Sequence, residues 1–88
     1  MRTGVLSIKP LQCRMARAAL DWSRKELACR AALGMETIYR FERGRKPHPE
    51  SIAKLRITFE AAGVLFLENT TGVGVILRHP SKDLPDPA

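Results

Sequence analysis

Cysteine and acidic residues are both scarce in this chain, and each shortage limits what the protein can be. The two cysteines, Cys13 and Cys29, form no C-x-x-C pair, and neither histidine stands at a zinc-ligand spacing from them. Free thiols in a cytoplasmic protein are the simple interpretation, and a disulfide between the two is the alternative. We therefore expect no metal site and no cofactor.

Long apolar stretches are missing as well. The N-terminus has no run long enough for a signal peptide or a membrane span, so we expect a cytoplasmic protein that does not enter a membrane. The chain also has no paired carboxylates, no suitably spaced nucleophile–base pair and no phosphate-cradling glycine loop. These absences argue against an enzyme.

What the chain does have is positive charge. Its 88 residues are 44% apolar, which is typical of one small globular domain. The chain has fifteen basic and nine acidic residues, which gives a formal charge of +6 and a pI near 10. Such an excess favours a polyanionic partner, with nucleic acid first and an anionic membrane surface second, although it can also serve solubility alone.

The stretch from residue 23 to residue 43, SRKELACRAALGMETIYRFER, predicts two short helices around a tight turn. Ser23 can cap the first helix, and Glu26 can reach back to close a capping box. Trp22 and Leu27 have the spacing of a hydrophobic staple. Neither helix is long enough to be stable alone, so both need packing from the flanking segments.

The second helix of this pair is expected over Met35–Arg43, with Ile38 and Phe41 pointing inward. Gly44 suits the left-handed position that ends many helices. Further helices are predicted at Pro10–Leu20 and Pro49–Ala62, because proline fits the first position of a helix. Their apolar faces are Leu11, Met15, Ala18 and Ala19 in the former, and Ile52, Leu55, Phe59 and Ala62 in the latter. Asp21 and Gly63 can end these two helices.

The periodicity changes after Gly63. Val64–Leu67 and Val75–Arg78 predict an antiparallel hairpin around a turn at 68–74. Both faces of the first strand are apolar, so we expect one face on the helices and the other on a second protomer. Residues 1–9 form an N-terminal arm, and residues 79–88, with three prolines, are expected to be a disordered tail.

Together these features resemble the lambda-repressor/Cro-like, or XRE-type, helix-turn-helix family over about residues 10–62. The resemblance is carried by the opening Trp22-Ser23-x-x-Glu26-Leu27-Ala28, the close Thr37-Ile38-x-x-Phe41-Glu42-Arg43-Gly44, and the spacing of Ala28 and Ile38. The tail Gly63-Val64-x-Phe66 … Gly74-Val75-x-Leu77 is similar to a C-terminal hairpin in many compact members. The resemblance implies a mainly α fold: a four-helix lambda-repressor-like DNA-binding domain at 10–63 with a C-terminal β-hairpin at 64–78, a candidate dimerisation element.

The resemblance also implies sequence-specific binding of double-stranded DNA by a homodimeric transcriptional regulator, with the recognition helix 35–43 in the major groove. The residues expected to contact bases are Met35, Glu36, Thr37 and Arg40. Those expected to contact phosphates are Arg24, Gly34, Tyr39, Arg43, Arg45 and Lys46, where Gly34 matches the helix cap and Tyr39 is assigned on its own chemistry. Arg17 and Glu42 match a buried ion pair between the first and third helices.

The base-contacting residues each have an alternative interpretation. The fork of Arg40 can take guanine O6 and N7 together, a contact that discriminates by about 1–3 kcal/mol, or it can be a plain exposed arginine. Thr37 suits a thymine methyl group or a phosphate, and Met35 suits a base contact or packing against the turn. Glu36 departs from expectation because it places a negative charge near phosphates, although it can accept from cytosine N4.

Other departures lie in the turn and at the C-terminus. The family usually has glycine where this chain has Ala32, and serine or threonine where it has Gly34. The hairpin stands in place of the usual fifth helix. An alternative function is therefore the antitoxin, or protein-interaction module, of a toxin–antitoxin pair with autoregulatory DNA binding. The apolar Val64–Leu67 strand and the proline-rich tail favour this alternative.

Overall fold

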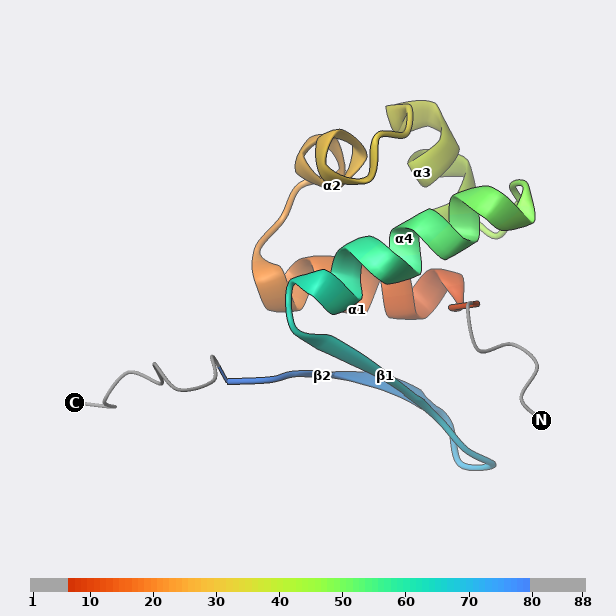
Figure 1. Cartoon of the computed structure of the whole chain (residues 1–88). Helices are drawn as coiled ribbons and strands as arrows, with labels where there is room; N and C mark the ends of the chain where they lie inside the picture. The colour runs from red at the N-terminus through yellow and green to blue at the C-terminus, as the bar shows by residue number, and fades with distance from the viewer. Residues whose placement is uncertain (1–6, 80–88) are drawn as a thin grey trace.

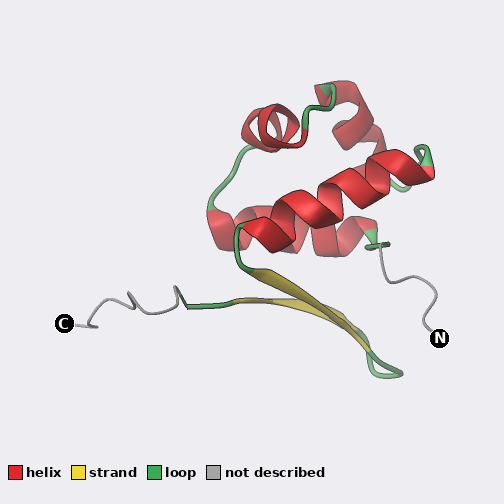
Figure 2. Cartoon of the chain, in the orientation of Figure 1, coloured by secondary structure: helices red, strands yellow, loops and turns green. Residues whose placement is uncertain are grey.

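The computed structural model describes residues 7–79, so most of the N-terminal arm and nearly all of the predicted tail lie outside the described residues. The described part is mainly helical and ends in one antiparallel hairpin (Figures 1 and 2). The elements, in chain order, are α1 Pro10–Leu20, α2 Arg24–Ala31, α3 Met35–Glu42, α4 Pro49–Ala61, β1 Val64–Glu68 and β2 Val73–Leu77.

The hairpin and the short helix pair lie on opposite sides of α1 and α4 (Figure 1). β1 contacts α4 and β2 contacts α1, while α3 contacts α1 and α2 contacts α4. α2 and α3 also contact each other across a three-residue turn at 32–34. The packing that these short helices need therefore comes from α1 and α4, and α3 keeps one side away from the rest of the molecule.

The predicted helix ends are largely confirmed. The Ser23 hydroxyl accepts from the Glu26 N–H at 2.9 Å, as expected of an N-cap. Asp21, Gly44 and Gly63 all have a positive φ, at 60°, 98° and 100°, which is the left-handed conformation that ends a helix. α3 and α4 each end one residue earlier than expected.

The capping box predicted at α2 is wrong. The Glu26 carboxylate lies with Arg30, one helical turn further on, at 2.6 Å. A related bond occurs at the start of α1 instead, where the Gln12 side chain accepts from the Lys9 N–H at 2.9 Å. The pull of a cation at the favourable i, i+4 spacing explains why Glu26 turns away from the cap.

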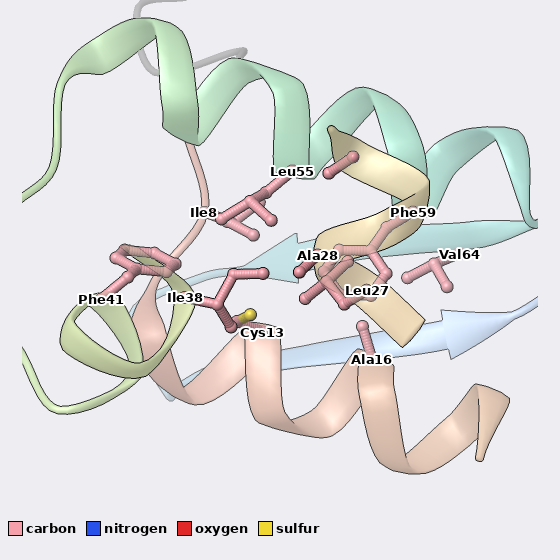
Figure 3. Packing of buried hydrophobic residues seen from close by; sticks show 11 residues of the cluster. Ile8, Cys13, Ala16, Leu27, Ala28, Ile38, Phe41, Leu55, Phe59 and Val64 are labelled. Atoms are coloured by element: carbon pink, nitrogen blue, oxygen red, sulfur yellow. The ribbon is translucent and has the colours of Figure 1, made fainter. Parts of the chain in front are cut away.

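The hydrophobic core lies between α1, the helix pair, α4 and the first strand (Figure 3). Its largest fully buried side chains are Phe59, Leu27, Ile38, Leu55, Val64 and Cys13. Phe59 is central, because the Trp22 ring stacks on it at 5.8 Å between centroids and the Phe66 ring meets it edge-on at 5.9 Å. Each large apolar side chain buried in this way contributes roughly 1.5–3 kcal/mol.

The apolar face predicted for α1 is wrong. Leu11, Ala18 and Ala19 are exposed, whereas Cys13 and Ala16 are fully buried. The helix is rotated so that Cys13 and Arg17 face the carboxylate of Glu42 and Gln12 faces the hairpin. Leaving a buried carboxylate unpaired costs more than exposing a leucine and two alanines, so the polar contacts fix the rotation.

The hairpin exists, but its turn is shorter than predicted. The strands pair from Val64 with Leu77 to Glu68 with Val73, so residues assigned to the turn at 68–74 lie partly in the strands. The Asn69 carboxamide accepts from the N–H groups of Thr71 and Gly72 at 2.7 and 3.1 Å. This side-chain bond makes a compact turn with fewer residues, because asparagine can replace part of the backbone turn.

The two faces of the hairpin differ in burial. Val64 is buried, and Phe66 and Val75 are partly buried against the helices. The side chains of Leu65, Leu67 and Ile76 are 40–47% exposed. We call these three residues the outer hairpin face. The expectation that one face packs on the helices is therefore confirmed.

Candidate nucleic-acid interface

α3 buries one side and exposes the other. Ile38, Phe41 and Glu42 are buried, and their spacing of three and four residues sets the inward side of the helix. Among the residues expected to contact bases, Met35, Glu36 and Arg40 are exposed and Thr37 is partly buried. Gly34, the N-cap of α3, is also exposed and has no side chain with which to cap the helix. All of these residues therefore belong to one accessible stretch of the chain.

Arg40 and Glu36 lie one turn apart on α3 and are paired with each other. The Arg40 Nε is 3.1 Å from a carboxylate oxygen of Glu36. Both side chains are well exposed, so in water the pair contributes only a few tenths of a kcal/mol to the helix. Two residues assigned separately to base contacts are therefore bonded to each other at the surface.

The Tyr39 ring has two arginines from different segments near it. The guanidinium carbon of Arg24, on α2, is 5.4 Å from the ring centroid, and that of Arg43, just after α3, is 5.3 Å from it. Cations at this distance from an aromatic ring are attracted to its face. The structure therefore brings together three of the residues expected to contact phosphates, and we call Arg24, Tyr39 and Arg43 the arginine–tyrosine cluster.

The loop after α3 adds two more cations. Arg45 and Lys46 are exposed, and the Arg45 N–H donates to the Arg40 carbonyl at 2.9 Å, which holds the loop against the end of α3. Both residues line an open groove between α3 and the start of α4, together with Thr37, Arg40, Pro47, His48 and Ser51. A groove with three cationic side chains suits a phosphodiester backbone.

Beneath this surface, Glu42 forms a buried ion pair with Arg17. The Arg17 Nε and a terminal nitrogen donate to the two carboxylate oxygens at 2.7 and 2.8 Å. Glu42 is only 4% exposed. Arg24 also donates to this carboxylate at 3.2 Å, so one acidic residue joins α1, α2 and α3. Such a pair specifies the packing of the helices more than it stabilises the fold.

The surroundings of Glu42 shift several pKa values. Burial would raise the pKa of the carboxyl, but hydrogen bonds from Arg17, Cys13 and Arg24 outweigh it and hold the pKa below its ordinary value. The bond to Glu42 raises the pKa of Arg17. Burial and then the bond from its own Sγ to Glu42, at 3.2 Å, raise the pKa of the Cys13 thiol, which stays protonated.

Three of the contacts that Glu42 makes were not predicted from the sequence. Cys13 donates to Glu42, an Arg14 terminal nitrogen donates to the Glu42 carbonyl at 2.6 Å, and Arg24 serves the ion pair as well as the surface. The spacing of Cys13, Arg14 and Arg17 places all three on one helix, so the sequence could have indicated these contacts only if the burial of Glu42 had been known. Both cysteines are free, Cys13 buried and Cys29 exposed, so the disulfide alternative is wrong.

No protein-family model matches the chain, and no curated protein sequence matches it significantly. What the site can do follows from its own residues. Between residues 7 and 79 no cluster of histidine, cysteine or acidic side chains could hold a metal ion. Over the same range no helix is both long and apolar enough to cross a membrane.

Proposed function

We propose that this protein binds double-stranded DNA sequence-specifically as a small transcriptional regulator of the lambda-repressor/Cro-like type. One observation carries the proposal: the exposed side of α3, with Arg40, is flanked by cations from α2 and from the loop after α3. In this arrangement α3 enters the major groove and α2 crosses the backbone. Contacts to phosphates then set the register, and contacts to base edges set the specificity.

The individual roles follow from side-chain chemistry. Arg40 donates to guanine O6 and N7, and Met35 and Thr37 make apolar contact with neighbouring bases. The arginine–tyrosine cluster, with Arg45 and Lys46 and the backbone at Gly34, holds phosphates. The cluster is suited to this because the Tyr39 ring attracts both guanidinium groups, so they need less ordering when DNA binds.

The outer hairpin face supports a homodimer. Leu65, Leu67 and Ile76 are exposed apolar residues. The hairpin that carries them lies on the other side of α1 and α4 from α3 (Figure 1). A second copy packed on this face would cover apolar surface and leave α3 accessible. Two half-sites would then be read by two copies of α3.

Selection from a random duplex library, with the full chain as bait, tests the proposal. We expect one enriched sequence, and fluorescence anisotropy with that duplex should show that Arg40→Ala weakens binding. Arg78→Ala is the matched control, because Arg78 is an exposed arginine beyond β2 and its loss removes the same charge. No enriched sequence, or equal effects of the two substitutions, would contradict the proposal.

A second candidate function uses the same exposed hairpin. The outer hairpin face is also a suitable surface for a different protein, as in an antitoxin that binds a toxin and regulates its own operator. Mass measurement separates the two candidates. A pure chain that is dimeric supports the regulator alone, whereas a monomer that forms a stable complex with the product of a neighbouring gene supports the antitoxin.

A further inference from the structure

The Glu36–Arg40 pair has a specific geometry. The Glu36 carboxylate meets the Arg40 Nε, at 3.1 Å, rather than the terminal nitrogens of the guanidinium. Arginine has five N–H donors in a fixed fork, and Nε supplies only one of them. The two terminal nitrogens carry the other four, and one N–H of each points along the end of the side chain, away from the bond to Glu36.

A bidentate contact to guanine needs two parallel N–H donors, one for O6 and one for N7. The two terminal nitrogens of Arg40 can supply these donors while Nε stays bonded to Glu36. We propose that Glu36 is a positioning residue that aims Arg40 at one guanine and does not itself contact a base. This inference rests on the proposed DNA binding, and it replaces the assignment of Glu36 to cytosine N4.

Glu36 also reduces the tendency of Arg40 to bind phosphates. A hollow on the surface is lined by Arg40, Tyr39, Arg43 and Arg45 together with Glu36, so several cations compete for the same phosphates. An unrestrained arginine has a long, flexible side chain and would bind a phosphate of any sequence. The negative charge of Glu36 repels phosphate and holds Arg40 back, which favours a base edge over the backbone.

The chain offers a matched pair for comparison. Glu26 and Arg30 on α2 have the same i, i+4 order and the same Nε contact, at 2.6 Å, and both side chains are exposed. Arg30, however, belongs to α2 and its guanidinium carbon lies 4.5 Å from the centroid of the Trp22 ring. The geometry of the pair is therefore common to both helices, and its place on α3 gives it the proposed role.

The test measures binding of the full chain to the enriched duplex and to duplexes with each base pair changed in turn. Arg40→Ala should remove discrimination at one G·C pair, a loss of roughly 5- to 150-fold. Glu36→Gln should reduce discrimination at that same pair by several-fold, and raise affinity for unrelated DNA because a negative charge is lost. The double variant should discriminate no less than Arg40→Ala alone, and Glu26→Gln should match the wild type.

Two results would overturn the inference. Glu36→Gln that relaxes a different base pair from Arg40→Ala would show that Glu36 reads a base itself. Glu36→Gln that leaves every pair unchanged would show that the bond to Arg40 has no role in recognition. Failure of the proposed function is distinguishable, because the wild-type chain would then enrich no sequence at all. Both side chains are exposed, so thermal melting of each variant should match the wild type and confirm folding.

Discussion

Arg17 and Glu42 meet through two parallel hydrogen bonds, and this contact fixes the position of α3 on α1. The carboxylate belongs to the last residue of α3, and the same oxygens accept from Arg24 and Cys13. Every donor around Glu42 comes from another helix. The direction in which α3 presents its exposed side is therefore set by a polar contact beneath it as well as by the core.

Glu42→Gln should destabilise the protein by about 3–5 kcal/mol at pH 7, because Arg17 and Arg24 lose their anionic partner. The effect should depend on pH. Since the pKa of Glu42 is lowered from about 4.5 in the folded state, its stabilisation is complete well above that value and is lost as the pH falls through the lower folded-state value. Urea unfolding should show wild type and variant converging on acidification. Glu50→Gln, at an exposed position, is the control, and a pH-independent gap between Glu42→Gln and wild type would contradict the prediction.

Arg43→Ala should weaken DNA binding on all sequences alike and lower the slope of log affinity against log salt by about 0.9, the value for one phosphate contact. The guanidinium of Arg43 lies over Tyr39 and is exposed, so its loss should leave stability nearly unchanged. Anisotropy titrations at several salt concentrations would measure the slope. A change in preference among duplexes, with the slope intact, would show that Arg43 contacts a base.

Gln12→Ala should loosen the hairpin. The Gln12 carboxamide donates to the carbonyls of Leu67 and Gly74 at 2.9 and 3.1 Å, and each bond contributes about 0.5–1.5 kcal/mol. Amide hydrogen exchange should speed up in β1 and β2 more than in α4. Gln12→Glu is the informative comparison, since it keeps an acceptor for Lys9 but sets a carboxylate against two carbonyls. If Gln12→Glu protects the hairpin as well as the wild type does, the donor bonds are unimportant.

Leu65→Lys should shift the chain from the proposed dimer to a monomer in sedimentation equilibrium, because it places a charge on the outer hairpin face. Ile57→Lys is the matched control, as Ile57 is 56% exposed but lies on α4. Affinity for a two-half-site duplex should fall with Leu65→Lys only. Equal behaviour of the two variants would show that the hairpin is not the dimer interface.

The helix ends could be predicted because each depends on one or two neighbouring residues. Ser23, Asp21, Gly44 and Gly63 determine their local backbone whatever the rest of the chain does. The spacing of Ile38 and Phe41 was equally informative about the inward side of α3.

The rotation of α1 could not be predicted in the same way. It depends on Glu42, 25 residues beyond Arg17, and on hairpin carbonyls more than 50 residues from Gln12. The spacing of apolar residues predicted that Leu11 is buried, because this spacing takes no account of a buried carboxylate elsewhere in the chain. The length of the hairpin turn was predicted wrongly for a related reason. The Asn69 side chain makes a hydrogen bond within the turn, so the turn needs fewer residues than its content of Thr, Asn and Gly suggests. In the candidate site, the pairing of Glu36 with Arg40 was not predicted.

Ala32 closes α2 with a φ of 57°, a left-handed conformation that costs a residue with a Cβ about 1–2 kcal/mol. Its side chain is exposed, so glycine at this position would relieve the strain without removing a buried contact. Ala32→Gly should therefore increase the free energy of unfolding. A lineage carrying that change could tolerate a destabilising substitution on α3 and so acquire a new operator preference while still folding.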